Sequence, residues 1–109
     1  MNNKRLYPNR LLITNEETPL AEKQVTRHFA SIDEQTTAIV QHPEDANKRF
    51  ARSLDYYLVQ DWENALVDLN DAIECDSTFM PAYFNRAIIR YKQLEFQKVE
   101  QQEQERQSS

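Results

Sequence analysis

Residues 50–62 read FARSLDYYLVQDW, and residues 84–96, which begin 34 positions later, read FNRAIIRYKQLEF. The shift places aromatic residues on aromatic residues and basic residues on basic residues. The matched pairs are Phe50 and Phe84, Arg52 and Arg86, Tyr57 and Tyr91, and Trp62 and Phe96. The same shift also places Ile32 on Leu66 and Ile39 on Ile73. A period of this length is that of a repeated pair of antiparallel helices, and parts of three such units are present.

The composition indicates a soluble acidic chain with one core. It has 109 residues, 28% of them charged, and a formal net charge of -5. No apolar run is long enough to cross a bilayer, so we expect no membrane insertion. The acidic body lacks the basic stripe that phosphate binding needs, and we expect no nucleic-acid partner. The compartment stays open: cytoplasmic if this is the whole chain, periplasmic if it comes from a secreted parent.

The first 17 residues form an irregular basic and apolar leader. Lys4, Arg5 and Arg10 give residues 1–13 a charge of +3 without any acid. The same stretch carries five large apolar side chains, namely Leu6, Tyr7, Leu11, Leu12 and Ile13. Burying even three of these would be favourable by about 5 kcal/mol before ordering entropy is subtracted. We therefore expect the leader to pack on the helical body, with a free leader as the alternative.

Capping residues and apolar periodicity predict five helices in a domain spanning residues 18–99. Thr18 and Pro19 open the first, through about residue 29, and a capping box of Ser31 and Glu34 opens the second, which His42 and Pro43 end near residue 41. The third covers about residues 46–59, and Asp61 caps the fourth, whose apolar stripe runs from Trp62 to Ile73. Ser77 or Thr78 caps the fifth, which has Pro81 in its first turn and ends near Phe96. Residues 100–109 form a polar tail, either a fraying helical extension or disordered.

The small and aromatic residues of these segments resemble the tetratricopeptide repeat family. Ala65 and Ala72 fill places that need close helix contact, Leu69 lies between them, and Tyr83, Ala87 and Phe96 follow in the next unit. Residues 84–87, FNRA, are similar to bacterial members. The resemblance implies an all-α, right-handed helical-repeat solenoid of about five antiparallel helices, and we expect it to be a segment of a larger protein. The chain departs from the family at Arg52 and Arg86, where Leu is usual, and at Gln60 and Leu94, which replace turn glycines.

The resemblance also implies a concave face lined by the first helix of each unit. Its groove-facing positions here are Asn47, Phe50, Leu54, Tyr57, Phe84, Ile88, Tyr91 and Lys92. An aromatic groove of this kind suits a peptide or amphipathic helix of a protein partner. We therefore expect a non-catalytic protein-protein interaction module. The alternative is a structural segment whose open apolar helix face is covered by a second copy, as a homodimer, or by further repeats. Some of these side chains, Phe50 and Leu54 above all, could instead be core.

No residue pattern predicts catalysis, a cofactor or a metal. His28 and His42 lie on different predicted elements, and residues 42–45, HPED, fit a solvated turn better than a metal site. Cys75 is the only cysteine, which excludes an internal disulfide, and we expect a buried, inert thiol. For Arg52 and Arg86, solvated ion pairs with Asp55, Asp61 or Glu95 are favoured over ligand binding.

Overall fold

The computed structural model describes residues 21–108, and this part of the chain consists of four helices joined by short turns. The helices are α1 (Glu22–Gln41), α2 (Ala46–Leu58), α3 (Trp62–Cys75) and α4 (Met80–Ser108). No strand occurs between residues 21 and 108. The all-α class is therefore confirmed, whereas the expected number of five helices is wrong. The leader, Thr18 and Pro19 lie outside the described residues.

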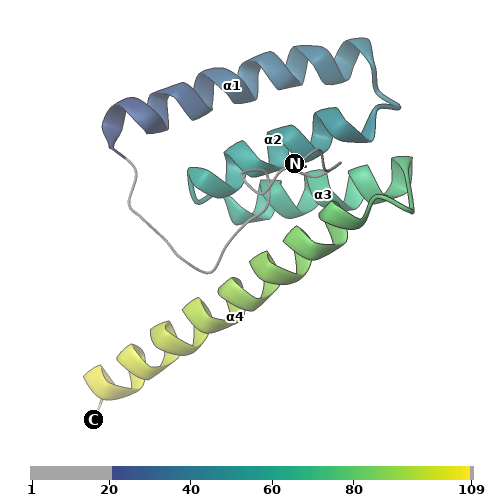
Figure 1. Cartoon of the computed structure of the whole chain (residues 1–109). Helices are drawn as coiled ribbons and strands as arrows, with labels where there is room; N and C mark the ends of the chain where they lie inside the picture. The colour runs from purple at the N-terminus through teal and green to yellow at the C-terminus, as the bar shows by residue number, and fades with distance from the viewer. Residues whose placement is uncertain (1–20, 109) are drawn as a thin grey trace, which may run out of the picture.

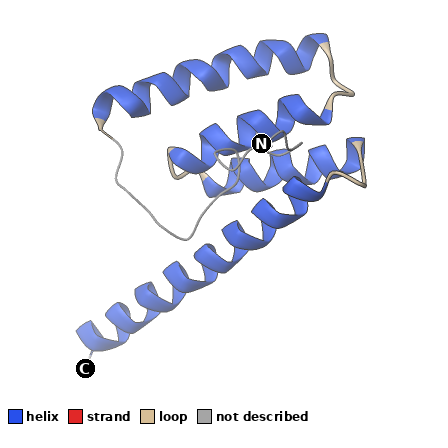
Figure 2. Ribbon diagram, in the orientation of Figure 1, coloured by secondary structure: helices blue, strands red, loops and turns tan. Residues whose placement is uncertain are grey.

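Each helix runs back along the one before it, so that neighbours in sequence are neighbours in space (Figure 1). The packing contacts join α1 to α2, α2 to α3, and α3 to α4. The helices are connected by short loops (Figure 2). Because α4 is the longest helix and crosses α3 at an angle, its C-terminal half extends beyond the other three helices (Figure 1).

The capping box predicted at Ser31 and Glu34 is wrong, because α1 continues through both residues. The Ser31 hydroxyl instead donates to Asp55 Oδ2 on α2 at 2.6 Å. Residues 22–41 contain neither Gly nor Pro, so nothing in the local sequence interrupts the backbone hydrogen bonds. At the start of α1 the side chain of Gln24 accepts from the Ala21 N–H at 2.8 Å. One uninterrupted helix therefore replaces the first two that the sequence predicts.

The turns between the other helices are closed without glycine. Asp61 caps α3 as expected, since its carboxylate accepts from the Asn64 N–H at 3.3 Å. Gln60 just before it has a φ of 67°, the left-handed conformation that favours glycine. The cap predicted at Ser77 or Thr78 is wrong, because α4 begins only at Met80. Asp76 orders that turn instead by accepting from the N–H and hydroxyl of Thr78.

The core lies where α2, α3 and α4 meet. Ala65, Leu69 and Ala72 on α3 are completely buried, as are Ala82 and Ile89 on α4. The predicted close helix contact at the two alanines is thus confirmed, since a small side chain lets the neighbouring backbones approach. Phe50 and Tyr57 on α2 complete this core. Phe79, a part-buried residue in the loop before α4, packs edge to face against Phe50, with the ring centroids 5.2 Å apart.

Past Phe96 the chain stays helical to Ser108, with every residue from 94 to 108 exposed. Leu94 lies within this helix, so the turn expected there does not form. The reason is that no apolar stripe follows which could fold a further helix back onto α4. Of the two states considered for the tail, the structure has the helical extension.

Candidate interaction surfaces

The structure divides the predicted groove into core and surface. Phe50 and Tyr57 are buried, at 5% and 9% exposure, and so cannot be surface anchors for a partner. Leu54 and Ile88 are partly buried against the same core, and Lys92 is also half-buried. On the surface remain three of the eight positions, namely Asn47 on α2 and Phe84 and Tyr91 on α4. The exposed aromatic residues of the predicted groove therefore both lie on α4.

Arg52 joins three helices, which differs from the solvated ion pair expected from the sequence. Its guanidinium donates to Asp68 on α3 through Nε, at 2.8 Å from Oδ2, and through NH2, at 2.7 Å from Oδ1. NH1 donates to the hydroxyl of Thr36 on α1 at 3.0 Å. The hydrogen bond to the Asp68 carboxylate raises the pKa of Arg52. Because Asp68 is only 1% exposed, this pair holds the helices together and is unavailable to a ligand.

Arg86, the matching residue of the next unit, has a weaker environment. It donates to Asn70 on α3 at 2.8 Å, and its guanidinium lies 5.3 Å from the centroid of the Tyr83 ring. Asn70 is exposed, whereas the corresponding contact of Arg52 is with a buried carboxylate. The two arginines of the repeat therefore have different roles, which their alignment could not distinguish.

Asp55 forms a second polar link, between α1 and α2. His28 Nδ1 lies 2.7 Å from Asp55 Oδ1, while Ser31 donates to the other carboxylate oxygen. Asp55 is mostly buried, with its side chain 14% exposed. A Ser, a His and an Asp thus meet at one place, but both the hydroxyl and the imidazole point at the carboxylate. That arrangement lacks the hydroxyl-to-imidazole hydrogen bond that would activate a nucleophile.

Cys75 is exposed, so the expectation of a buried thiol is wrong. It ends α3 and lies against the turn between α1 and α2, with Sγ 3.6 Å from the Pro43 carbonyl oxygen. Arg49 NH1 donates to the same carbonyl and lies 3.7 Å from Sγ. These contacts tie the end of α3 to the earlier turn. Within residues 21–108 no group of three or more His, Cys, Asp or Glu side chains could hold a metal ion.

Five exposed apolar residues recur along α4 at a regular spacing, and we name this row the α4 seam. It comprises Met80, Phe84, Ala87, Tyr91 and Leu94. All five are exposed, and the four large side chains have exposed fractions between 48% and 59%. Their spacing of 4, 3, 4 and 3 residues is that of the a and d positions of a coiled coil. The sequence carried this signal, although the groove prediction named only two of the five.

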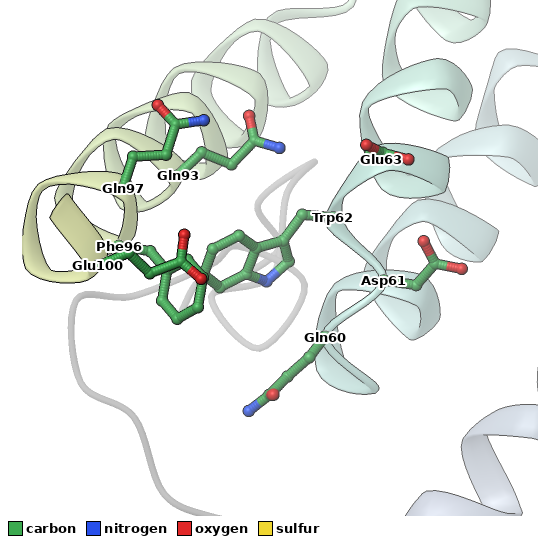
Figure 3. Close-up of a pocket in the computed structure, with 8 residues that line it drawn as sticks. All are labelled: Gln60, Asp61, Trp62, Glu63, Gln93, Phe96, Gln97 and Glu100. Carbon is green, nitrogen blue, oxygen red and sulfur yellow. The ribbon is translucent and has the colours of Figure 1, made fainter. Parts of the chain in front are cut away.

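A pocket of about 340 Å³ lies where α4 leaves the start of α3. Trp62 and Phe96 meet in it edge to face, with ring centroids 6.0 Å apart (Figure 3). Around them stand Gln60, Asp61 and Glu63 from the start of α3 and Gln93, Gln97 and Glu100 from α4. We name this the Trp62–Phe96 pocket. The alignment pointed to both aromatic residues and the capping pattern to Asp61, whereas Glu63 and Glu100 come from positions that no motif identified.

None of the four described helices is both long and apolar enough to cross a membrane. Comparison with known proteins finds no family model, no curated protein and no solved structure that matches the chain.

Proposed function

We propose that this chain is a tetratricopeptide-like interaction module without catalytic activity, and that its α4 seam binds an amphipathic helix of a protein partner. The observation that carries the proposal is the row of exposed apolar side chains at coiled-coil spacing on α4. A typical surface scatters such side chains singly, whereas a contiguous row points to an interaction. The 34-residue repeat and the succession of antiparallel helices support the fold assignment.

The spacing of the seam favours a helix as the bound element. Residues at a and d positions form knobs that fit between side chains of a facing helix, whereas an extended peptide alternates its side chains every second residue. Met80 and Leu94 lie 14 residues apart, which is about 21 Å of helix. A partner helix of about four turns would cover this length. Phe84 and Tyr91, in the middle of the seam, would supply most of the binding energy.

The end of the seam favours a different protein over a second copy of the chain. The next two positions of the pattern are Lys98 and Gln101, which are polar and exposed. Two copies pairing through this row alone would bury about two heptads, fewer than the three or four over which a heptad pattern indicates a coiled coil. A partner with further apolar contacts of its own does not have this limit. Self-association remains the alternative outcome of the test.

The test uses the full chain and a designed amphipathic peptide of about four helical turns with leucine at its a and d positions. Isothermal titration should show binding that Phe84→Ser with Tyr91→Ser weakens at least tenfold. A matched control, Phe29→Ser with Val40→Ser, removes two exposed apolar side chains from α1 and should leave affinity within a factor of two. Equal weakening by both double variants would contradict a specific role for the seam.

Light scattering on the same samples separates the alternative. If the seam serves self-association, the mass of the parent chain should rise with concentration to that of a dimer. The Phe84→Ser, Tyr91→Ser variant should then keep the mass of a monomer. A monomeric parent that binds the peptide would support the partner-binding function.

A further inference from the structure

A second site is separate from the α4 seam. The Trp62–Phe96 pocket has an aromatic centre and an acidic edge. Asp61, Glu63 and Glu100 are three acidic residues among its lining, and none of the eight lining residues that the structure describes is basic. Phe96 is 54% exposed and Glu63 and Glu100 are exposed, so the pocket is accessible from solvent. Its chemistry therefore favours a cation.

The rings of Trp62 and Phe96 favour a planar organic cation over a metal ion. The planar guanidinium group of arginine stacks on indole and phenyl rings and donates up to five hydrogen bonds in fixed directions. Three glutamine side chains, Gln60, Gln93 and Gln97, add amide oxygens that can accept such bonds (Figure 3). A small metal ion would make no use of the rings. A neutral apolar group would leave three carboxylates without a counter-charge.

The indole nitrogen gives a further requirement. Trp62 Nε1 is buried and has no hydrogen-bond partner among the described residues. Leaving such a donor unsatisfied is unfavourable, because the buried group has given up its hydrogen bonds to water. An arginine within a peptide carries backbone carbonyl oxygens close to its side chain, and one of these can accept from Nε1 once binding exposes that nitrogen. A free guanidinium ion lacks that acceptor.

We propose that the Trp62–Phe96 pocket binds the arginine side chain of a peptide segment, with the guanidinium group against the two rings and its N–H groups donating to the carboxylates of Glu63 and Glu100. Asp61 contributes its negative charge without a direct hydrogen bond to the arginine, because its oxygens already accept from the backbone and side chain of Asn64. The bound arginine brings α3 and α4 together at the point where the two helices diverge.

Trp62 is the only tryptophan of the chain, so its fluorescence reports on this pocket alone. The probe is the capped tripeptide acetyl-Gly-Arg-Gly-amide, titrated into the full chain at constant ionic strength. A saturable change in emission is expected. The same tripeptide with citrulline, which keeps the shape and lacks the charge, should bind at least fivefold more weakly. Equal binding of the two peptides would overturn the proposal.

Matched variants locate the site. Glu63→Gln with Glu100→Gln should weaken binding of the arginine tripeptide at least fivefold, because both acceptors lose their charge. The control, Glu74→Gln with Glu105→Gln, removes two exposed carboxylates from the same two helices outside the pocket and should change affinity less than twofold. If the two double variants behave alike, general attraction to an acidic surface explains the binding and the site is refuted.

The arginine can come from another protein or from the chain's own leader, which contains Arg5 and Arg10. A full-length variant with Lys4→Gln, Arg5→Gln and Arg10→Gln distinguishes the two sources. Tighter binding of the tripeptide to this variant than to the parent would assign the pocket to the leader. Unchanged binding would assign it to a partner. No saturable change in either background would overturn the proposal.

Discussion

The guanidinium of Arg52 and the carboxylate of Asp68 face each other with two parallel hydrogen bonds, 2.8 and 2.7 Å long, across the contact of α2 and α3. The carboxylate is almost completely buried, and the Arg52 side chain is 19% exposed. Removing the arginine would strand a buried charge, whereas removing the carboxylate would leave a cation that can still reach water. Loss of Arg52 should therefore destabilise the fold mainly because the buried carboxylate of Asp68 is left without a counter-charge.

For this reason Arg52→Met should lower the free energy of unfolding by about 2–4 kcal/mol. Arg86→Met is the matched control, since Arg86 occupies the same repeat position and donates to the exposed Asn70, and it should cost less than about 1 kcal/mol. Urea denaturation measures both. If the two substitutions lower the free energy of unfolding equally, the loss is due to the repeat position and not to the buried carboxylate.

Ala72→Leu should destabilise the fold by about 1–3 kcal/mol, because Ala72 is completely buried and a larger side chain would push the helices apart. Val67→Leu on the same helix is the control: Val67 is 55% exposed and has room for the added carbon. Its midpoint of denaturation should stay within error of the parent. An unchanged midpoint for Ala72→Leu would contradict the packing of α3 described above.

Gln60→Gly should stabilise the chain by about 0.5–1 kcal/mol, since glycine adopts the φ of 67° without the steric cost borne by a side chain. Glycine at Glu34, an exposed position within α1, should instead destabilise by about 1 kcal/mol. Thermal and urea denaturation of the two variants should move in opposite directions. A loss of stability at both positions would mean that Gln60 contributes contacts that outweigh its backbone strain.

Asp76 should titrate below the usual range for an aspartate, because its carboxylate accepts from the hydroxyl and N–H of Thr78 and these bonds lower its pKa. A group with a lower pKa in the folded state stabilises the fold above its unfolded pKa, and this contribution disappears as the pH falls through the folded pKa. NMR titration of the Asp76 carboxyl carbon measures the shift. Thr78→Ala should raise the pKa toward the ordinary value, and an unchanged value would contradict the assigned cause.

Deleting residues 101–109 should reduce the helical circular dichroism signal while moving the melting temperature by less than about 2 °C. Residues 101–108 are helical but all exposed, so their helix adds little to the stability of the core. A fall of several degrees would show that this part of α4 packs on another part of the molecule.

The local features of this fold could be predicted from the sequence. Helix α2 begins and ends within about one residue of its predicted bounds, and α3 begins directly after its predicted cap, Asp61. Ala65 and Ala72 are buried as the repeat pattern indicates. These features depend on residues a few positions apart, because caps, helical periodicity and small contact residues act within one helix or one turn.

Only the tertiary structure determined which of several possible hydrogen-bonding and packing partners each of these side chains contacts. Ser31 could cap a helix or bond to Asp55, and the second choice leaves α1 unbroken. Arg52 takes the buried Asp68 on the next helix and not one of the acidic residues that the sequence analysis suggested. The same packing turns Phe50 into core and leaves its repeat counterpart Phe84 on the surface, since α4 has no following helix among the described residues to cover it. A repeat pattern specifies equivalent positions, but the burial of each position depends on which helices lie beside it.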